Sequence, residues 1–335
     1  MRPAVILVLI ITAASWNVKG QEYNIMFYNV ENLFDTVDDT LTDDDEFQPE
    51  GERRWTNYRY WQKIDALARV IAASGGWNLP VMAGVCEVEN ADVVADLAYR
   101  SVLEGAGYGF VHRESPDRRG IDIALLYRRA DVKIIMSGSW IPESGPGETF
   151  DSRNLLYVKS LLGNDTLHLI MCHWPSRRGG TMAAEPVRKE MAMLVRTKVD
   201  SLQRASGNRA PVIVMGDFNA VSGEPVTEIM TDGGSLVNLT NALSSAGKGS
   251  YRYQGNWEMI DQVFVSPVMC DSAGYFITGP EEFSVVDLPF LLKDDPDYPG
   301  KKPRPTYGGF TYEGGYSDHL PVMITIKHRT TVIPE

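Results

Sequence analysis

Beyond its first twenty residues the chain lacks any apolar run long enough to cross a membrane. Residues 1–20 have the pattern of an export signal, with Arg2 near the start and an apolar stretch from Ala4 to Ala14 that is itself too short to span a bilayer. A suitable cleavage point follows at Gly20-Gln21. We therefore expect a signal peptide over residues 1–20, export to the periplasm or the medium, and no stable membrane insertion after cleavage. An uncleaved anchor is the alternative.

Cysteine is scarce as well. The three cysteines, Cys86, Cys172 and Cys270, are odd in number and lack the spacing of a metal-binding motif. Such thiols are most often buried and free, because cysteine packs as a small apolar side chain. A disulfide between two of them is the alternative in an oxidising compartment.

Positive charge is in deficit. Lysine and arginine number 32 against 44 aspartates and glutamates, which gives a formal net charge of −12. This balance argues against a protein that holds nucleic acid by bulk attraction over a broad surface. Basic residues do gather in two short pairs, Arg118-Arg119 and Arg177-Arg178. We expect these pairs to draw an anionic substrate to a nearby site, with ordinary surface charge as the alternative.

Short apolar runs separated by turn residues predict β-strands along most of the chain. Two pairs of consecutive runs, 121–127 with 132–136 and 155–161 with 167–172, have no helix between them and predict hairpins. So many directly connected strands exclude a purely parallel sheet. The predicted strands cover residues 23–30, 81–85, 121–127, 132–136, 155–161, 167–172, 212–215, 260–265 and 320–326.

Apolar residues at helical spacing predict two longer helices. No linker or internal repeat divides the chain, so we expect one domain over residues 21–330. The order of elements fits an α/β fold, a four-layer α/β sandwich in which two mixed β-sheets pack face to face with helices on both outer faces. The helical positions are Trp61, Ile64, Leu67, Ala68 and Ile71 in the first helix, and Val187, Met191, Leu194, Val195, Val199 and Leu202 in the second.

Two long segments have neither the apolar runs of strands nor the apolar spacing of helices. Residues 35–52 are dense in acidic side chains but lack the regular ligand spacing and glycine of a calcium loop, so we expect a solvated acidic loop. Residues 283–315 are rich in proline, glycine, tyrosine and lysine, and they lead directly into Ser317-Asp318-His319. Loops of this length are usually functional or disordered, and we expect this one to form a rim over a site.

Oxygen-bearing side chains stand at the ends of several separate strands. Most of them, taken alone, are explained as turn residues or surface acids. Asp261 differs because it lies among apolar residues, where a carboxylate needs a partner. Magnesium prefers oxygen ligands and keeps several waters, so a few such side chains can hold it. These side chains are Asn29, Glu87, Asp217, Asn219, Asp261 and Asp318. Together with His319 they predict metal-dependent hydrolysis of a phosphoester.

The joint order of these residues resembles the endonuclease/exonuclease/phosphatase superfamily, which includes pancreatic-type deoxyribonuclease, apurinic endonucleases, bacterial sphingomyelinases and inositol polyphosphate phosphatases. The resemblance extends over almost the whole expected mature chain. The matching stretches are Tyr28-Asn29-Val30, Cys86-Glu87-Val88, Arg119-Gly120-Ile121-Asp122, His173, Gly216-Asp217-Phe218-Asn219, Ile260-Asp261 and Ser317-Asp318-His319.

The resemblance implies a role for each matching metal ligand. Glu87 would be the principal ligand of Mg²⁺ or Mn²⁺, with Ca²⁺ as a further candidate. Asn29 and Asp318 would help directly or through water. Asp217 and Asn219 would orient the attacking water, stabilise the leaving side, or hold a second cation.

The resemblance also implies two catalytic histidines. His319 would contact the scissile phosphate or act as general acid or base, with Asp261 bonded to its other ring nitrogen. His173 matches a histidine of the deoxyribonuclease and sphingomyelinase branches, and would bind phosphate or protonate the leaving oxygen. Asp122 is the expected partner of His173.

Three arginines are candidates for substrate binding. Arg153 resembles an arginine that binds phosphate in the deoxyribonuclease branch, and its planar fork fits two phosphate oxygens. A surface ion pair is the alternative for this residue. Arg119 and Arg177 belong to the basic pairs described above.

The leading functional expectation is a secreted, metal-dependent phosphodiesterase, a nuclease that hydrolyses DNA or RNA. The alternative is a phosphatase or phospholipase C-like enzyme for phosphoinositides, sphingomyelin or other small phosphoesters. Residues 288–292 are the nearest candidate for the exposed apolar hairpin that a membrane-acting enzyme would need. A binding protein that keeps the fold without the chemistry is the least expected outcome, and no protein partner is implied.

Overall fold

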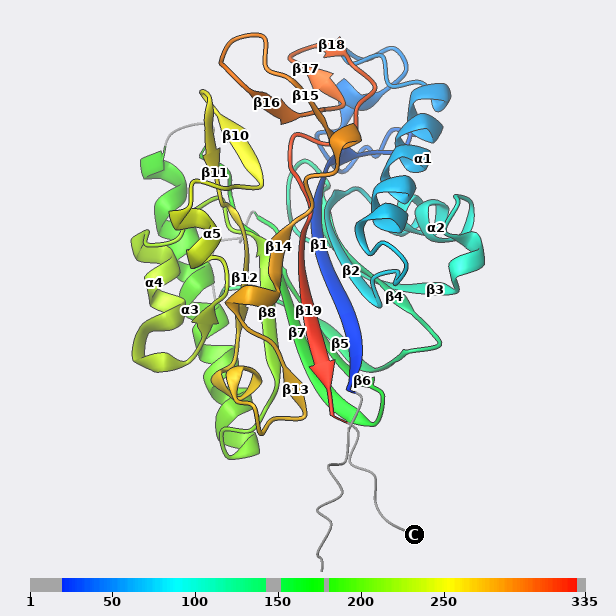
Figure 1. The fold of residues 1–335 in the computed structure, drawn as a ribbon. Coiled ribbons are helices and arrows are strands. Elements are labelled where there is room, and N and C mark those ends of the chain that lie inside the picture. The colour runs from blue at the N-terminus through cyan, green and yellow to red at the C-terminus, as the bar shows by residue number, and fades with distance from the viewer. Residues whose placement is uncertain (1–19, 143–151, 178–180, 330–335) are drawn as a thin grey trace, which may run out of the picture.

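The computed structural model describes residues 20–142, 152–177 and 181–329, without the side chains of 181–183. Two mixed β-sheets lie face to face at the centre, and helices cover the outer faces (Figure 1). The predicted four-layer sandwich is therefore confirmed. Apart from Gly20, the expected signal peptide lies outside the described residues. Within the described ranges, no helix has the length and apolar character needed to cross a bilayer.

The first sheet contains the first and last strands of the chain. Its order is β13-β19-β1-β2-β4-β3, with β14 also paired to β19. Only the β1–β2 pair is parallel among these strands. The bounds are β1 (Gln21–Leu33), β2 (Met82–Val88), β3 (Tyr108–Arg113), β4 (Asp122–Arg128), β13 (Phe276–Ile277), β14 (Phe283–Val285) and β19 (Val322–His328).

The second sheet has the order β5-β6-β7-β8-β12-β9. Its β7–β8 pair is parallel and its other pairs are antiparallel. Within the described residues, three two-stranded hairpins stand outside both sheets. The sheet strands are β5 (Val132–Trp140), β6 (Leu155–Leu162), β7 (Asp165–His173), β8 (Val212–Asp217), β9 (Val237–Asn238) and β12 (Asp261–Val265). The hairpins are β10 (Tyr251–Tyr253) with β11 (Asn256–Glu258), β15 (Leu292–Asp294) with β16 (Lys301–Pro303), and β17 (Tyr307–Gly308) with β18 (Thr311–Tyr312).

Both predicted helices are present. They are α1 (Asn57–Ser74) and α3 (Thr181–Ser206). α1 lies on the first sheet together with α2 (Ala91–Tyr99), and α3 lies on the second sheet together with α4 (Pro225–Thr231) (Figure 1). A short α5 (Asn241–Ser245) follows β9. The start of α2 is fixed by Asn90, whose side-chain oxygen accepts hydrogen bonds from the N–H groups of Asp92 and Val93.

The core consists of three apolar layers, one between each pair of adjacent structural layers. Side chains alternate along the strands, so Met26 and Tyr28 of β1 pack toward α1, whereas Ile25 and Phe27 pack toward the second sheet. A third layer joins the second sheet to α3 and includes Val195. These layers explain why the central strands read as continuous apolar runs, because both of their faces are buried.

Replacing Leu169 by alanine is expected to lower the free energy of unfolding by about 2–5 kcal/mol, because this fully buried side chain fills space between the two sheets. Urea denaturation followed by circular dichroism measures the change. Ile135→Ala on β5 is the control, since Ile135 is 48% exposed and should cost much less. Equal losses in the two variants would contradict a packed layer between the sheets.

One predicted hairpin is present and the other is wrong. β6 and β7 pair through the turn at Gly163-Asn164, with Leu162 opposite Asp165, as predicted. The runs 121–127 and 132–136 do not pair, because β4 belongs to the first sheet and β5 to the second. The chain crosses between the sheets at this point. Sequence alternation gives strand positions but does not distinguish a hairpin from such a crossover.

The two long segments are more ordered than their composition indicates. Residues 283–315 contain β14 to β18, and residues 288–292 are not an exposed apolar hairpin, because Leu291 is buried and its apolar neighbours pack against the first layer of the core. In the acidic segment, Asp44 and Phe47 are buried, so the loop is only partly solvated. All three cysteines are free, with Cys86 and Cys172 buried and Cys270 exposed.

Candidate active site

A cavity of about 720 Å³ opens at one edge of the sandwich. β1, β2, β7 and β8 end at this edge, and β12 and β19 begin there, so their terminal residues face a common space. Nine of the eleven predicted site residues line the cavity. They are Glu87, Arg119, Arg153, His173, Arg177, Asp217, Asn219, Asp318 and His319. The other two, Asn29 and Asp261, are buried and hydrogen-bonded to residues of the lining.

The backbone is irregular where it meets the cavity. The register shifts between Asn29 and Leu33 in β1, and again between Cys86 and Val88 in β2. Four non-glycine residues here have positive φ values: Glu31 and Asn32 at 54°, Glu87 at 64° and Asn219 at 46°. Left-handed backbone at such residues costs on the order of 1–3 kcal/mol each and is typical of functional sites.

Asn29 connects the two sheets at the floor of the cavity. Its amide nitrogen donates to Oε1 of Glu87 at 3.2 Å and to Oδ2 of Asp217 at 3.0 Å. Its amide oxygen accepts the backbone N–H of Glu31 at 2.9 Å. In this arrangement Asn29 holds two carboxylates, and its oxygen would face the cavity only after rotation of the amide.

His319 and Asp261 form a buried pair. Nδ1 of His319 lies 2.7 Å from Oδ2 of Asp261, which also accepts the hydroxyl of Ser250 at 2.6 Å. Burial alone would lower the pKa of His319, but the carboxylates of Asp261, Asp217 and Asp318 raise this pKa well above its ordinary value. Nε2, the other ring nitrogen, lies 3.9 Å from Oδ2 of Asp217. His319 is therefore held as an imidazolium, with its second N–H directed toward the carboxylates of the cavity.

His173 has the opposite electrostatic environment. Burial and the charges of Arg153, Arg119 and His319 lower the pKa of His173 well below its ordinary value. Its Nε2 lies 3.3 Å from Nη2 of Arg153, and an arginine nitrogen can only donate. The ring is therefore neutral, and Nε2 accepts from the guanidinium. The same atom is 3.6 Å from Glu87 and 3.8 Å from Asp217.

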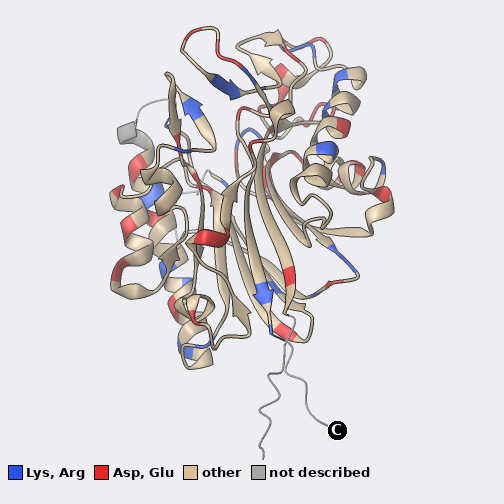
Figure 2. Cartoon of the chain, in the orientation of Figure 1, with Lys and Arg blue, Asp and Glu red and all other residues tan. Residues whose placement is uncertain are grey.

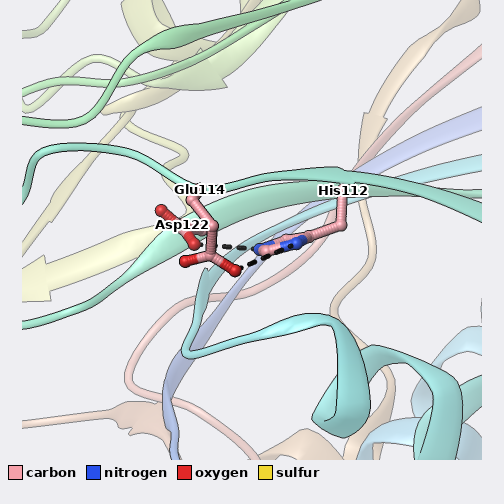
Figure 3. A group of neighbouring side chains, drawn as sticks. All are labelled: His112, Glu114 and Asp122. Atoms are coloured by element: carbon pink, nitrogen blue, oxygen red, sulfur yellow. Dashed lines mark hydrogen bonds and ion pairs between the residues drawn. The ribbon is translucent and has the colours of Figure 1, made fainter. Parts of the chain in front are cut away.

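The predicted pairing of Asp122 with His173 is wrong. Asp122 contacts His112 instead, with Oδ2 at 2.9 Å from Nε2, while Glu114 lies 3.7 Å from the other ring nitrogen (Figure 3). The two carboxylates thus contact different ring nitrogens of His112. Asp122 also accepts the backbone N–H of Ser115 at 2.8 Å, and so fixes the start of the loop that carries Asp117 and Arg119.

The three predicted arginines have different surroundings. Arg153 is buried and not part of a surface ion pair, since Nη1 bonds the buried Asp117 at 2.8 Å and Nη2 reaches the carbonyl of Trp174 at 3.0 Å. Arg119 lines the cavity with a half-exposed side chain. Arg177 is bonded to Glu224 and lies 3.6 Å from Glu258, so nearby carboxylates compensate its charge. Arg178, its neighbour in the basic pair, lies outside the described residues.

A buried lysine beneath the cavity had no signal in the sequence. Lys63 of α1 is 2% exposed and donates to the Thr306 hydroxyl at 2.5 Å and to the Tyr316 carbonyl at 2.6 Å. Glu31, also buried, accepts the N–H groups of Thr306 and Tyr307. Burial lowers the pKa of Lys63 to about 8, and burial with Asp318 nearby raises that of Glu31 to about 7. The two residues connect the expected rim segment to the site.

The outer wall of the cavity is aromatic and charged. Two of its tyrosines come from the β10–β11 hairpin and one from the expected rim segment, which supports the prediction that residues 283–315 border the site. Tyr251 also contacts the ring of His319, with centroids 4.9 Å apart. These wall residues, which the sequence did not single out, are Arg53, Tyr251, Tyr253, Glu258, Tyr307 and Gly309.

The site has the chemistry of a cation site. Burial and Asp261 raise the pKa of Asp217 to about 7, which reflects a local excess of carboxylates. Oδ1 of Asp261 has no hydrogen-bond partner among the described residues. Arg119 and His319 overcome the effect of burial on Glu87 and hold its pKa below the ordinary value, so this carboxylate is charged. Carboxylate and amide oxygens of this kind are the ligands that a hard divalent ion prefers.

Comparisons with known proteins agree with this geometry. The sequence profile described as "Endonuclease/Exonuclease/phosphatase family" matches residues 24–328. No curated protein gives a significant sequence match. Among solved structures, an endonuclease/exonuclease/phosphatase family protein from Bacteroides thetaiotaomicron is 18% identical with a TM-score of 0.57, covering 92% of this chain and 98% of the other.

Two further structures have the same fold. A mannosyl-6-phosphatase from Bacteroides thetaiotaomicron is 18% identical with a TM-score of 0.56, covering 91% of this chain and 99% of that one. The human nocturnin catalytic domain with bound sulfate is 16% identical with a TM-score of 0.55, covering 92% and 94%. At these identities the structures establish the fold alone, whereas the profile match establishes the family. The chain therefore belongs to the endonuclease/exonuclease/phosphatase family, whose members are phosphoester hydrolases.

Proposed function

We propose that this protein hydrolyses a compact phosphoester with the help of a divalent cation, Mg²⁺ or Mn²⁺, with Ca²⁺ as a weaker candidate. The observation that carries the proposal is the buried His319–Asp261 pair, which faces Glu87, Asp217 and His173 across one cavity. Glu87 and Asp318 would hold the cation, with Asn29 contributing through water or after rotation of its amide. When bound, the cation would neutralise phosphate oxygens and make a nearby water more acidic.

The chain's own residues would bind and orient the phosphate. Arg153 is pre-organised by Asp117, and its remaining donor capacity suits an anionic oxygen. The His319 imidazolium would donate to a phosphate oxygen or protonate the leaving group, and Asp261 fixes its orientation. Asp217 and Asn219 would accept hydrogen bonds from the attacking water. His173 would keep Arg153 in place by accepting from it.

The shape of the cavity favours a compact substrate. Besides the strand ends, the β10–β11 hairpin, Tyr307 and Arg53 line the cavity. Glu258 places a carboxylate on that wall, 3.6 Å from Arg177, so the wall is not purely basic. In Figure 2, lysines and arginines are scattered along the chain among aspartates and glutamates. A phosphorylated small molecule satisfies these features better than duplex DNA.

Hydrolysis of nucleic acid, our leading expectation from the sequence, is the second candidate. Arg119 and Arg153 line the cavity beside Tyr251 and Tyr253, and tyrosine rings of this kind can stack on bases. A single-stranded end would fit into the cavity more easily than a duplex.

A substrate panel separates the two candidates. Mature protein with Mg²⁺ or Mn²⁺ would be tested on p-nitrophenyl phosphate, bis-p-nitrophenyl phosphate, sugar phosphates, phosphoinositide headgroups, sphingomyelin vesicles, single-stranded oligonucleotides and supercoiled plasmid. We expect the highest kcat/KM on a small phosphoester and little plasmid nicking. Efficient plasmid nicking would replace the compact-substrate proposal with the nuclease one. No hydrolysis of any substrate would contradict both.

Arg153→Lys is expected to reduce kcat/KM by roughly 10- to 100-fold, because lysine keeps the charge but loses the planar fork held by Asp117. Steady-state kinetics on the best substrate of the panel measure the loss. Arg177→Lys serves as the comparison, since Glu224 and Glu258 already compensate that charge, and its effect should be several times smaller. A larger loss in Arg177→Lys would reverse the assignment of the phosphate-binding arginine.

We also propose that the protein is exported, on the pattern of residues 1–20. Cell fractionation with N-terminal sequencing of the mature chain tests this. Export with cleavage near Gly20 is expected, and an uncleaved cytoplasmic chain would contradict it.

A further inference from the structure

We propose that the acidic loop at residues 38–45 holds a structural Ca²⁺ ion, at a site separate from the catalytic cavity. The ligands from side chains would be Asp38, Asp44 and Asp45. None of these residues lines the cavity. The proposal is independent of the hydrolytic reaction.

Three carboxylates converge in this loop. One oxygen from each of Asp38, Asp44 and Asp45 lies within 4.8 Å of the other two. Asp44 ends an irregular stretch and Asp45 begins the 3₁₀ helix η1 (Asp45–Phe47), so the turn brings residues six and seven positions apart back to Asp38. Carboxylates at this spacing repel one another unless a cation lies between them.

Asp44 supplies the second, independent observation. Asp44 is only 1% exposed, whereas Asp38 and Asp45 are exposed. Oδ2 of Asp44 accepts the N–H of Asp39 at 3.2 Å and the side-chain amide of Gln48 at 2.9 Å. Oδ1 is buried and has no hydrogen-bond partner in the described part of the chain.

Neither protonation state satisfies that oxygen. A charged Oδ1 needs a donor and a protonated one needs an acceptor, and the described residues offer neither to it. A buried unpartnered carboxylate oxygen is costly, so a ligand is the simplest explanation. The pKa of Asp44 is raised by burial and by the charges of Asp38 and Asp39, which a bound cation would offset.

The donor set selects the type of ion. All three side chains offer carboxylate oxygen and no nitrogen or sulfur, which favours a hard cation over zinc or copper. An irregular loop suits the flexible coordination of Ca²⁺ better than the strict octahedron of Mg²⁺. Backbone carbonyls and water would supply the remaining ligands. No calcium motif is recognisable in the sequence, because the acids lack the regular spacing of the common calcium loop.

The loop is connected to two walls of the catalytic cavity. Asp43 pairs with Arg118 at 2.7 Å, and its N–H donates to the Arg118 carbonyl, directly before Arg119. Glu46 lies 3.3 Å from Arg53, which lines the cavity. A cation in the loop would therefore stabilise the chain and order the positions of Arg53 and Arg119.

The test measures Ca²⁺ binding directly. Mature protein carrying Glu87→Gln, which removes the proposed catalytic ligand, is stripped with EGTA and titrated with CaCl₂ by calorimetry. We expect one Ca²⁺ per chain and a rise in Tm of several degrees at saturating Ca²⁺. A double variant that carries Asp44→Asn together with Glu87→Gln should bind Ca²⁺ at least about tenfold more weakly and lose most of the Tm shift.

Two companion variants keep the result interpretable. Asp38→Asn changes an exposed ligand, so it should fold normally and still weaken binding. Glu52→Gln removes an exposed acid of the same segment outside the cluster and should leave binding unchanged. The proposal is overturned if the Glu87→Gln protein binds no Ca²⁺, if all variants bind equally, or if MgCl₂ binds as tightly as CaCl₂. Hydrolysis by the wild-type protein is assayed separately, and its outcome does not depend on Ca²⁺ binding to this loop.

Discussion

Glu87→Gln is expected to reduce phosphoester hydrolysis by about 10³-fold or more while the fold is retained. The change replaces a charged oxygen with an amide of nearly the same shape. Cation-assisted stabilisation of the transition state is worth several kcal/mol, and about 1.4 kcal/mol corresponds to a tenfold change in rate. Glu87 lines the cavity, and its left-handed backbone accommodates glutamine as well as glutamate.

The matched control is Glu258→Gln, which makes the same chemical change on the outer wall of the same cavity. Its activity should stay within a few fold of wild type. Steady-state rates at several Mg²⁺ and Mn²⁺ concentrations would be measured for both variants. Similar losses in the two would mean that Glu87 contributes only to the general charge of the cavity and not to holding the cation.

His319→Asn is the second change with a large expected effect, a loss in kcat of about 10²- to 10⁴-fold. It removes the imidazolium that faces the carboxylates of the cavity. Asp261→Asn should also reduce kcat, because asparagine cannot stabilise the charged ring or fix its orientation in the same way. Asparagine keeps the size of Asp261, so packing beside Ser250 is retained.

The double variant tests whether the pair acts as a unit. With His319 absent, Asp261 has no ring to orient, so the double variant should be about as slow as His319→Asn alone. Losses that simply multiply would show that Asp261 acts elsewhere, for example through Ser250. Circular dichroism and Tm of each protein distinguish a catalytic loss from unfolding.

The sequence predicted the parts of the fold that depend on long, two-faced apolar runs. β1, β2, β7 and β8 were found because both faces of these strands are buried. β3 and the short hairpin strands were missed, since pairing and not local pattern defines them. The β4–β5 error has a related cause, because consecutive strands can enter different sheets when the chain crosses the interlayer.

Site residues at strand ends were predictable, whereas their partners were not. Asp217 and Glu87 follow apolar runs, and the parallel topology brings those ends together. The partner of Asp122 depends on the β3–β4 pairing, which was not foreseen. Lys63 looks like an ordinary surface lysine within α1, and only the packing of Thr306 and Tyr316 over it reveals a buried cation.

The two histidines of the cavity have pKa values shifted in opposite directions. Asp261 raises the pKa of His319, whereas burial beside Arg153 lowers that of His173. Groups of the same type with opposite shifts are typical of sites that divide acid and base roles. Here the two pKa values differ because His319 lies beside a carboxylate and His173 lies beside a guanidinium.

The most direct test of a cation-dependent hydrolase is removal and return of the metal. Wild-type protein would be dialysed against EDTA, assayed on p-nitrophenyl and bis-p-nitrophenyl phosphate, and then supplied with Mg²⁺ or Mn²⁺. We expect hydrolysis to disappear in EDTA and to return with added cation in the wild type but not in Glu87→Gln. An undiminished rate in EDTA would contradict the cation-dependent account of this site.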